Sequence, residues 1–166
     1  MMLEDLMDLF VDELKDLYSA ETQITKALPK MVKAATSKDL KLAFASHLQE
    51  TEGHVRRLDH IFELLEKSPK GKTCKGMKGL LEEGSEMIKE DADPDVKDAG
   101  LISAAQRVEH YEMAGYGTVR TYAEILRRDD VAKILQETLQ EEKSADTKLT
   151  KLAQQINVQA KSAAAA

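Results

Sequence analysis

The sequence predicts an all-α protein, an antiparallel bundle of four long helices, and three observations support this fold class. Apolar residues recur at the three- and four-residue spacing of helices along most of the chain. The 166 residues include only 8 glycines and 3 prolines, which is too few for the many turns of an all-β fold. The long periodic segments also fall into two pairs, each joined by a short polar turn. Two such helical hairpins can pack together as one bundle.

Length and composition indicate one globular domain. A chain of 166 residues is long enough to bury a core and too short for two large domains. Hydrophobic residues make up 42% of the chain and charged residues 33%, which is typical of globular proteins. We expect one helical domain over residues 1–160. The tail "KSAAAA", residues 161–166, has nothing to pack and is expected to be disordered.

Charge and patterning exclude several partners. The net charge is −6, with 30 acidic against 24 basic residues, so most of the surface lacks the basic field that holds a nucleic acid. No run approaches the ~18 apolar residues of a membrane span. The first residues are acidic and do not resemble a signal peptide, and the single cysteine, Cys74, cannot form an internal disulfide. We expect a cytoplasmic protein that binds neither nucleic acid nor membrane.

The first pair of predicted helices covers Leu3–Ala35 and Leu40–Leu65. Pro29 lies inside the first of them and is expected to kink or interrupt it, because its ring removes a hydrogen bond and crowds the preceding turn. Thr36–Asp39 supply polar cap residues between the two helices. Such a short connection predicts that the two helices form an antiparallel hairpin.

A long connection follows the first hairpin. The segment "KSPKGKTCKGMKG", residues 67–79, is rich in lysine and glycine and is expected to be an exposed loop. A short amphipathic helix is predicted over Leu80–Lys89. The next long helix is expected to start near Pro94, with Asp93 as its cap and the proline in its first turn.

The second pair of predicted helices runs from Pro94 to about Leu126 and from Val131 to Ile156, with "RRDD", residues 127–130, between them. Two hairpins joined by one long crossover are typical of the ferritin-like class of four-helix bundles. The fold prediction is therefore a ferritin-like bundle with a short helix in the crossover between its second and third long helices.

An internal repeat supports two related hairpins. At a constant offset of 91 residues, "HLQET" (47–51) aligns with "TLQEE" (138–142), and Glu21 aligns with Glu112. The two halves look like two copies of one helical hairpin, although matches of five residues in helical sequence of low diversity also arise by chance. We therefore expect the two hairpins to place equivalent positions at the same depth in the bundle.

Carboxylates interrupt the apolar stripes of three helices. With about 100° of rotation per residue, Glu21, Glu112 and Glu142 each fall near the centre of the stripe of their own helix. A buried charge is unfavourable unless it is paired, hydrogen-bonded or bound to a cation. These residues therefore predict a polar site inside the bundle.

The second helix has imidazoles at the equivalent depth. His47, Thr51 and His54 occupy the centre of its stripe, and Glu50 lies at the edge. Glu109 on the third helix is likewise an edge residue beside a central carboxylate, as is Glu141 on the fourth. All four long helices are thus predicted to direct groups that can bind metals towards one level.

Converging carboxylates repel one another, so such a bundle needs trapped protons, basic partners or cations. The apolar stripes contain no inward-facing lysine or arginine at this level. Oxygen-rich sites with one or two imidazoles suit iron or manganese. A site for two iron or manganese ions is the resulting hypothesis. The alternatives are solvated flanks of kinked helices or a buried network of shared protons and hydrogen bonds.

Four motifs resemble the YciF-type family of ferritin-like, rubrerythrin-like bacterial stress proteins: "LYSAET" (17–22), "HLQETEGHVRRL" (47–58), "VEHYEMAGYGT" (108–118) and "LQEEKSAD" (139–146). The resemblance extends from about Asp5 to Ala153. It implies a rubrerythrin-like four-helix bundle, commonly a homodimer, with a role in stress responses.

The resemblance also implies a ligand set. Glu21, Glu50, Glu109, Glu112 and Glu142 match positions where ferritin-like proteins place metal ligands, and His54 is added here because it lies one turn beyond Glu50. His47, three residues before Glu50, is the alternative imidazole.

The sequence departs from the Glu-x-x-His motif that ferritin-like di-iron proteins carry on two helices. Gly53 follows Glu50 at the third position, Ser144 follows Glu141, and Ala145 follows Glu142. A site dominated by carboxylates, weakly loaded or vestigial, is therefore also compatible with the sequence.

Two functions of different classes follow. The first is a non-haem di-metal oxidoreductase that acts on peroxide or dioxygen and needs an external electron donor, because the chain has no cysteine-rich redox module. The second is a non-enzymatic structural or interaction homodimer that retains a vestigial metal site. Iron storage is a third possibility, and it requires a closed shell that the sequence does not reveal.

Overall fold

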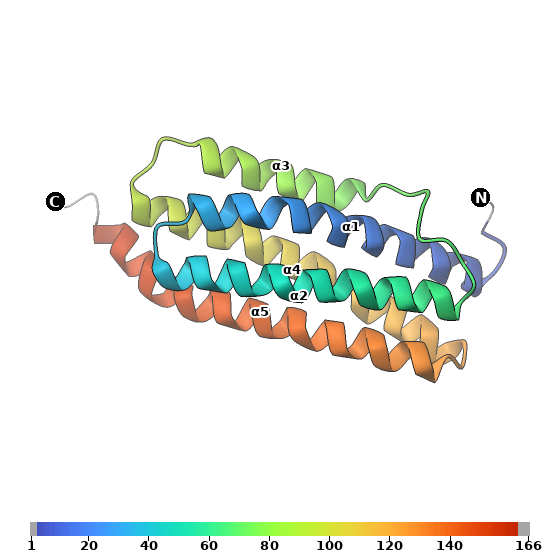
Figure 1. The fold of residues 1–166 in the computed structure, drawn as a ribbon. Coiled ribbons are helices and arrows are strands. Elements are labelled where there is room, and N and C mark those ends of the chain that lie inside the picture. The colour runs from blue at the N-terminus through green and yellow to red at the C-terminus, as the bar shows by residue number, and fades with distance from the viewer. Residues whose placement is uncertain (1–2, 163–166) are drawn as a thin grey trace.

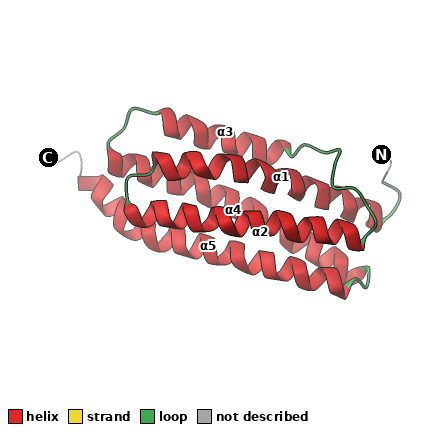
Figure 2. Ribbon diagram, viewed as in Figure 1, coloured by secondary structure: helices red, strands yellow, loops and turns green. Residues whose placement is uncertain are grey.

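The computed structural model describes residues 3–162, and within this range the chain forms five α-helices and no strand. The helices are α1 (Leu6–Ala34), α2 (Lys38–Leu64), α3 (Lys75–Lys89), α4 (Pro94–Ile125) and α5 (Asp129–Ser162). The four long helices form a bundle, and the shorter α3 lies along its outside against α1 and α4 (Figures 1 and 2). The predicted all-α bundle with a crossover helix is confirmed.

Helix direction explains why the crossover is long. Within each hairpin the helices are antiparallel, but α2 and α4 run in the same direction, so α2 ends at the opposite end of the bundle from the start of α4 (Figure 1). The 32 residues of α4 span about 48 Å at a rise of about 1.5 Å per residue. Residues 65–93 must therefore travel the length of the bundle, and α3, about 22 Å long at the same rise per residue, covers about half of that path.

The turn of the first hairpin is fixed by a residue of the second. Ser37 caps α2, with its side chain accepting a hydrogen bond from the Leu40 amide at 3.4 Å. The amides of Thr36 and Ser37 donate to the two carboxylate oxygens of Asp98 at 2.8 and 2.7 Å. Asp98 is buried on α4, so this carboxylate ties the first turn to the second hairpin while satisfying two amides that the helix end would leave unpaired.

The structure corrects one expectation in α1. The helix continues through Pro29 to Ala34, so the interruption expected as one outcome at this proline is wrong. Buried Leu28 and Met31 flank the proline, and their packing against the core holds the last turns of the helix.

The expected exposed loop at residues 67–79 is also partly wrong. Helix α3 begins at Lys75, five residues before the predicted start, and both Cys74 and Met77 are fully buried. The Cys74 thiol caps the helix by accepting a hydrogen bond from the Met77 amide at 3.3 Å. Gly76 and Gly79, which belong to the segment expected to be a loop, lie inside α3.

Side-chain hydrogen bonds attach the start of α3 to the bundle. The Cys74 amide donates to Ser19 Oγ at 2.9 Å, and Cys74 Sγ lies 3.0 Å from the hydroxyl of Tyr111. That hydroxyl donates to Asp16 Oδ2 at 3.1 Å, so the thiol is the donor to Tyr111. We call Ser19, Cys74, Tyr111 and Asp16 the α3 anchor.

The apolar core is divided into two clusters along the bundle axis. One cluster includes Phe10, Leu14 and Phe62, and the other includes Phe44 and Leu101. On each long helix, the polar residues singled out from the sequence lie between residues of one cluster and residues of the other. The candidate site is therefore a polar layer closed at both ends by hydrophobic packing.

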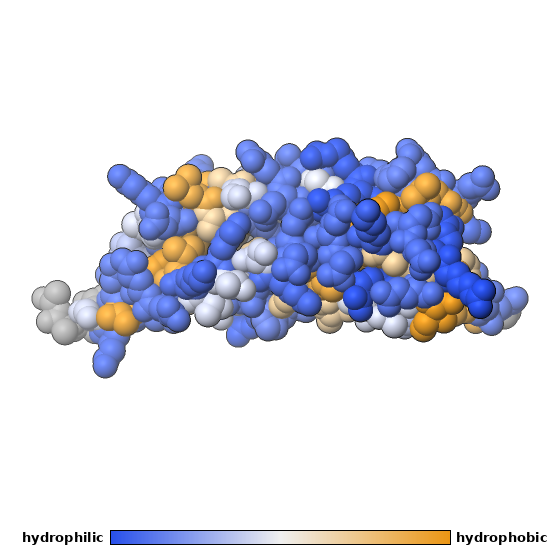
Figure 3. Space-filling model, turned by 90° about the horizontal axis from the view of Figure 1, so that it is seen from below, coloured by the Kyte–Doolittle hydropathy of each residue, from blue (hydrophilic) through white to orange (hydrophobic). Residues whose placement is uncertain are grey.

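Three observations concern the surface, the membrane-span criterion and the end of the chain. Figure 3 shows a mostly hydrophilic face with small, separated hydrophobic patches. No helix in residues 3–162 combines the length and apolar composition of a membrane span. Helix α5 extends to Ser162, two residues into the segment expected to be disordered, and residues 163–166 lie outside the described range.

Candidate metal centre

The polar layer at mid-bundle contains buried acidic and imidazole side chains from all four long helices. These are Glu21 from α1, His47 and His54 from α2, Glu109 and Glu112 from α4, and Glu142 from α5. Each is at most 6% exposed. Bulk water cannot solvate side chains this well buried, so the partners of their polar atoms must come from within the layer.

The six side chains form two groups that share one member. Ligand atoms of His47, Glu109, Glu112 and Glu142 all lie within 4.8 Å of one another. Atoms of Glu21, His54 and Glu142 satisfy the same condition. Glu142 therefore stands between two adjacent positions, as a bridging carboxylate does in a dinuclear site.

The inner atoms approach one another without forming hydrogen bonds. His54 Nδ1 lies 2.9 Å from Glu142 Oε1 and 3.1 Å from Glu21 Oε1, and His47 Nε2 lies 3.1 Å from Glu109 Oε1. Both nitrogens nevertheless lack a hydrogen-bond partner, because the ring N–H directions do not meet these oxygens. These atoms point towards the same space inside the polar layer and do not pair with one another.

The carboxylates show the same pattern. Both oxygens of Glu112, both of Glu142, and one each of Glu21 and Glu109 are buried without a hydrogen-bond partner. A buried polar atom left in this state costs on the order of 1–3 kcal/mol. Eight of the nine such side-chain atoms found in residues 3–162 belong to the polar layer. This concentration fits a site that is completed by cations.

Each imidazole is held from outside the layer by a second carboxylate. His54 Nε2 lies 2.8 Å from Glu141 Oε2, and Arg57 binds both oxygens of Glu141 at 2.7 and 2.8 Å. His47 Nδ1 lies 3.2 Å from Glu50 Oε2. A carboxylate on the outer nitrogen fixes the orientation of a ring and directs its other nitrogen inward, as is common around metal-binding histidines.

Two hydroxyl groups complete the surroundings. The hydroxyl of buried Tyr116 donates to Glu21 Oε1 at 2.5 Å. The hydroxyl of Thr51 donates to the backbone oxygen of His47 at 2.9 Å and so turns away from the layer. Of these two, only Tyr116 acts directly on a carboxylate of the cluster.

In the absence of metal, the electrostatics favour bound protons. Burial and the charges of Glu142 and Glu21 raise the pKa of Glu112 well above its ordinary value. Burial raises the pKa of Glu142 to about 7, although His54 opposes the shift. Burial lowers the pKa of His54, but its contacts with Glu142 and Glu21 outweigh burial and raise it to about 10. Without metal, bound protons thus reduce the negative charge of the layer, which cations would neutralise when bound.

The donor set matches two divalent cations. The two groups contain four carboxylates and two imidazoles. If all four carboxylates are ionised and both imidazoles are neutral, the charge of the layer is −4, which two divalent ions balance. Carboxylate oxygen and imidazole nitrogen are ligands that suit iron and manganese. The residues present therefore fit a dinuclear centre of these metals.

The structure brings together most of the residues predicted from the sequence. Glu21, His54, Glu109, Glu112 and Glu142 converge in the layer. Glu50, also predicted as a ligand, is in neither group, because its carboxylate faces the outer nitrogen of His47 and its side chain is 29% exposed. His47 and His54 were alternatives in the sequence, and the structure directs both towards the layer.

The internal repeat indicates His54 as a motif histidine, which a search for histidine three residues after Glu50 does not find. The offset of 91 residues aligns Thr51 with Glu142 and His54 with Ala145. The Glu-x-x-His motif is thus divided between the hairpins: α2 keeps the histidine and has threonine at the acidic position, whereas α5 keeps the glutamate and has alanine at the histidine position.

Comparisons with known proteins support a ferritin-like assignment. A family model described as "Domain of unknown function (DUF892)" matches residues 5–162. Protein YciF of Escherichia coli strain K12 is 47% identical over 155 residues, which covers 92% of this chain and 93% of YciF.

Three solved structures have similar folds. The crystal structure of the E. coli stress protein YciF matches with a TM-score of 0.90 and 45% identity, over 92% of this chain and 97% of that chain. YcfI from Rhodopseudomonas palustris matches with a TM-score of 0.87 and 46% identity, over 89% and 94%. A ferritin-like di-iron carboxylate protein from Bacillus anthracis has a TM-score of 0.70 at 15% identity, over 92% and 99%, and shows the fold alone. The chain belongs to the DUF892 family, as a relative of the E. coli stress protein YciF with an all-α ferritin-like fold.

Proposed function

We propose that this protein binds two divalent ions, iron or manganese, in the polar layer and acts on peroxide or dioxygen during stress. The observation that carries the proposal is the set of eight buried nitrogen and oxygen atoms that face common space without hydrogen bonds. When bound, the metals would supply Lewis acidity and redox capacity.

The side chains would divide the binding between two positions. Glu21 and His54 would hold one ion, while His47, Glu109 and Glu112 would hold the other. The carboxylate of Glu142 is near both positions and would bridge them.

The surroundings would orient the site and close both of its ends. Glu141 and Arg57 fix the ring of His54. Tyr116 holds a proton at its oxygen beside Glu21. The two hydrophobic clusters exclude bulk water from both ends of the layer and thereby strengthen its electrostatic interactions.

Turnover would require an external electron donor. The chain has one cysteine, Cys74, and its thiol is engaged in the α3 anchor. The homodimer implied by the resemblance and the cytoplasmic location remain predictions.

Metal content tests the proposal directly. Protein purified from cells grown with added iron or manganese should contain about two ions per chain by elemental analysis. Glu112→Gln and Glu21→Gln should lose most of this metal, because each removes a charge that the cations balance. Glu83→Gln, at an exposed position of α3 outside the layer, is the matched control and should retain it. Equal metal content in all four proteins would contradict the assignment.

Reactivity needs a separate measurement. The loaded protein, supplied with a chemical reductant, should consume hydrogen peroxide faster than the metal-free protein, and Glu142→Gln should abolish the difference. If loaded and metal-free proteins consume peroxide equally, the layer binds metal without the proposed activity.

One observation favours the alternative, a structural or interaction protein with a vestigial site. Thr51 and Ala145 stand where the motif places a glutamate and a histidine, so the layer has lost two of the usual ligands. Trapped protons can also neutralise the layer without metal, as the raised pKa of Glu112 indicates. This alternative predicts metal-free protein after growth in either metal.

A further inference from the structure

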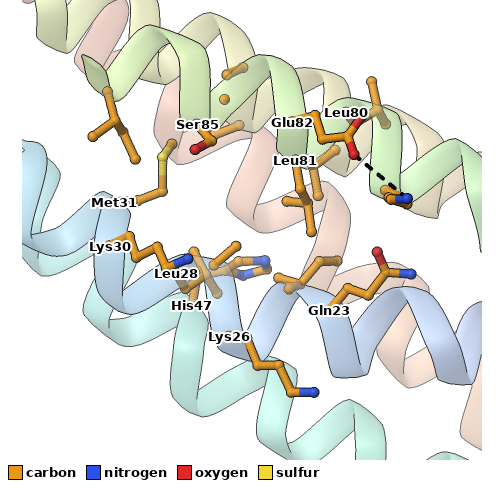
Figure 4. A pocket seen from close by; sticks show the side chains of 18 of the residues that line it. Gln23, Lys26, Leu28, Lys30, Met31, His47, Leu80, Leu81, Glu82 and Ser85 are labelled. Atoms are coloured by element: carbon orange, nitrogen blue, oxygen red, sulfur yellow. Dashed lines mark ion pairs between the residues drawn. The ribbon is translucent and has the colours of Figure 1, made fainter.

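A cavity of about 310 Å³ lies between α1, α3 and α4, beside the polar layer. Figure 4 shows Leu28 and Met31 on the α1 side, facing Leu81 and Ser85 of α3. The walls are mainly aliphatic, and the volume is at the lower end of the range for small-molecule sites.

Small residues create this space. Ala27, Gly84, Ala104 and Ala105 line the cavity at the contact between the three helices. Their short side chains cannot fill the gap between helix axes, which is usually about 8–10 Å. The cavity therefore follows from the sequence of the contact and is held open by rigid helices.

The cavity reaches two side chains of the polar layer. His47 and Glu109 belong to its lining, and Figure 4 places His47 at the side opposite α3. His47 Nε2 and Glu109 Oε2 are both buried without a hydrogen-bond partner. Because these two atoms are assigned to the metals, they mark the inner end of the cavity, and the aliphatic walls and the lysines are left to hold an organic ligand.

The rim of the cavity is positively charged. The lining contains Lys26, Lys30 and Lys78 and two acidic residues: Glu109 at the polar layer and Glu82, which pairs with Lys78 at 3.8 Å. Lys26 extends away from α3 (Figure 4). Lys30 forms no ion pair with any residue between positions 3 and 162 and is available to an anion.

We propose that this cavity binds a small aliphatic carboxylate, with its chain against the apolar walls and its carboxylate at the rim beside Lys30. At roughly 30 Å³ of liquid volume per water-sized unit, the space takes about ten non-hydrogen atoms. Octanoate has this size. The cavity is much larger than peroxide or dioxygen, and its aliphatic walls fit a hydrocarbon chain. Binding of this ligand in the cavity does not depend on bound metal.

Binding of octanoate to metal-free protein tests the cavity by itself. Isothermal titration should detect octanoate binding, and Ser85→Trp should weaken it by about tenfold or more, because the indole fills the space. Glu83→Trp, on the same helix but outside the lining, is the matched control and should bind normally. Absence of wild-type binding at millimolar octanoate, or equal binding by Ser85→Trp, would overturn the proposal.

The charge at the rim has its own control. Lys30→Gln should weaken octanoate binding by about two- to fivefold, the range expected for one exposed ion pair, and should leave octan-1-ol binding unchanged. Lys33→Gln, an exposed position of α1 outside the lining, should affect neither ligand. Equal effects of Lys30→Gln on the acid and the alcohol would refute the assigned position of the carboxylate.

These experiments separate the two proposals. Octanoate binding is measured without metal, and metal content is measured without octanoate. Ser85→Trp should retain the wild-type metal content, because Ser85 is not in the polar layer. Wild-type protein that binds two metal ions but no octanoate would refute the cavity proposal alone. Wild-type protein that binds octanoate but no metal would refute the metal proposal alone.

Discussion

At the scale of single residues, Glu112 shows the conflict between stability and function most clearly. Neither of its oxygens has a hydrogen-bond partner, and the side chain is fully buried. Its own helix offers no basic partner for this carboxylate, because the nearest buried residues of α4 are apolar or, like Glu109, acidic. Such a residue destabilises the metal-free protein and becomes favourable when a cation is present.

Replacing this carboxylate by a hydrocarbon should stabilise the metal-free protein. We expect Glu112→Leu to raise the free energy of unfolding by on the order of 1 kcal/mol, because it removes two unsatisfied buried oxygens. Urea denaturation without metal measures the change. Glu83→Leu, at an exposed site, should change it little. A strongly destabilised Glu112→Leu would mean that hidden partners hold this carboxylate in place.

Metal affinity should depend strongly on pH. Metal binding must displace protons from Glu112, whose pKa is well above normal, and from His54, whose pKa is raised to about 10. It must also displace the proton of Glu142 below the pKa of about 7 to which burial raises that group. Lowering the pH therefore favours the metal-free form, by about tenfold in affinity per pH unit for each displaced proton. Manganese titrations near pH 8 and pH 6 should show much weaker binding at the lower pH. Equal affinities would indicate that the layer is already ionised without metal.

The sequence predicts an inward-facing site residue where that residue lies at the centre of an apolar stripe. Glu21 and Glu112 interrupt apolar stripes, and helical periodicity alone indicates that they point inward. The role of Glu50 was not predictable in this way, because an edge residue can face either a metal or the outer nitrogen of a histidine. That choice depends on the rotation of α2 against its neighbours, which no local pattern records.

At the scale of elements, α3 depends on one close contact. A Cβ atom at Gly76 would lie 2.7–2.9 Å from the Tyr111 ring and hydroxyl, whereas one at Gly79 would have nothing within 4 Å. Both glycines lie in the same helix. Gly76 therefore permits the close approach that the α3 anchor requires, and Gly79 serves no comparable purpose.

This difference provides a matched pair of substitutions. Gly76→Ala should destabilise the protein by about 1–3 kcal/mol, because the ring of Tyr111 must shift and weaken the anchor. Gly79→Ala should stabilise it by about 0.5–1 kcal/mol, because alanine is the better helix former. Thermal unfolding measures the difference, and hydrogen exchange should show lower protection of α3 only in Gly76→Ala. Identical effects of the two changes would show that the contact does not matter.

The start of a helix was predicted best where a residue next to it in the sequence forms its cap. Asp93 and Pro94 marked the start of α4 correctly, since the Asp93 carboxylate accepts a hydrogen bond from the Asp95 amide at 2.9 Å. The start of α3 was missed because its cap is a cysteine and its first turns contain glycines, which usually signal a break. Packing on Tyr111 overrides that tendency, and a contact between distant segments is not visible in local sequence.

At the scale of the whole molecule, the polar layer joins the two hairpins. α1 and α2 contribute Glu21, His47 and His54, and α4 and α5 contribute Glu109, Glu112 and Glu142. Cations in the layer would bind both hairpins at once. They would hold the native state together and would find no equivalent site in the unfolded chain.

Metal should therefore raise the stability of the entire domain. With manganese at about 100 times its dissociation constant, one binding site adds about 2.7 kcal/mol to the free energy of unfolding. Chemical denaturation with manganese and after dialysis against a chelator measures this gain. Glu142→Gln, which alters the residue common to both groups, should show almost none. A gain of the same size in that variant would place the stabilising ion elsewhere.

The divided Glu-x-x-His motif makes each hairpin depend on the other for the metal centre. Two copies of α1–α2 would bring together imidazoles with few acidic partners, and two copies of α4–α5 would bring together acids without an inward-facing imidazole. The two hairpins are therefore not interchangeable, and neither could form the centre by self-association. Their covalent linkage ensures that the acids and the imidazoles meet within one molecule.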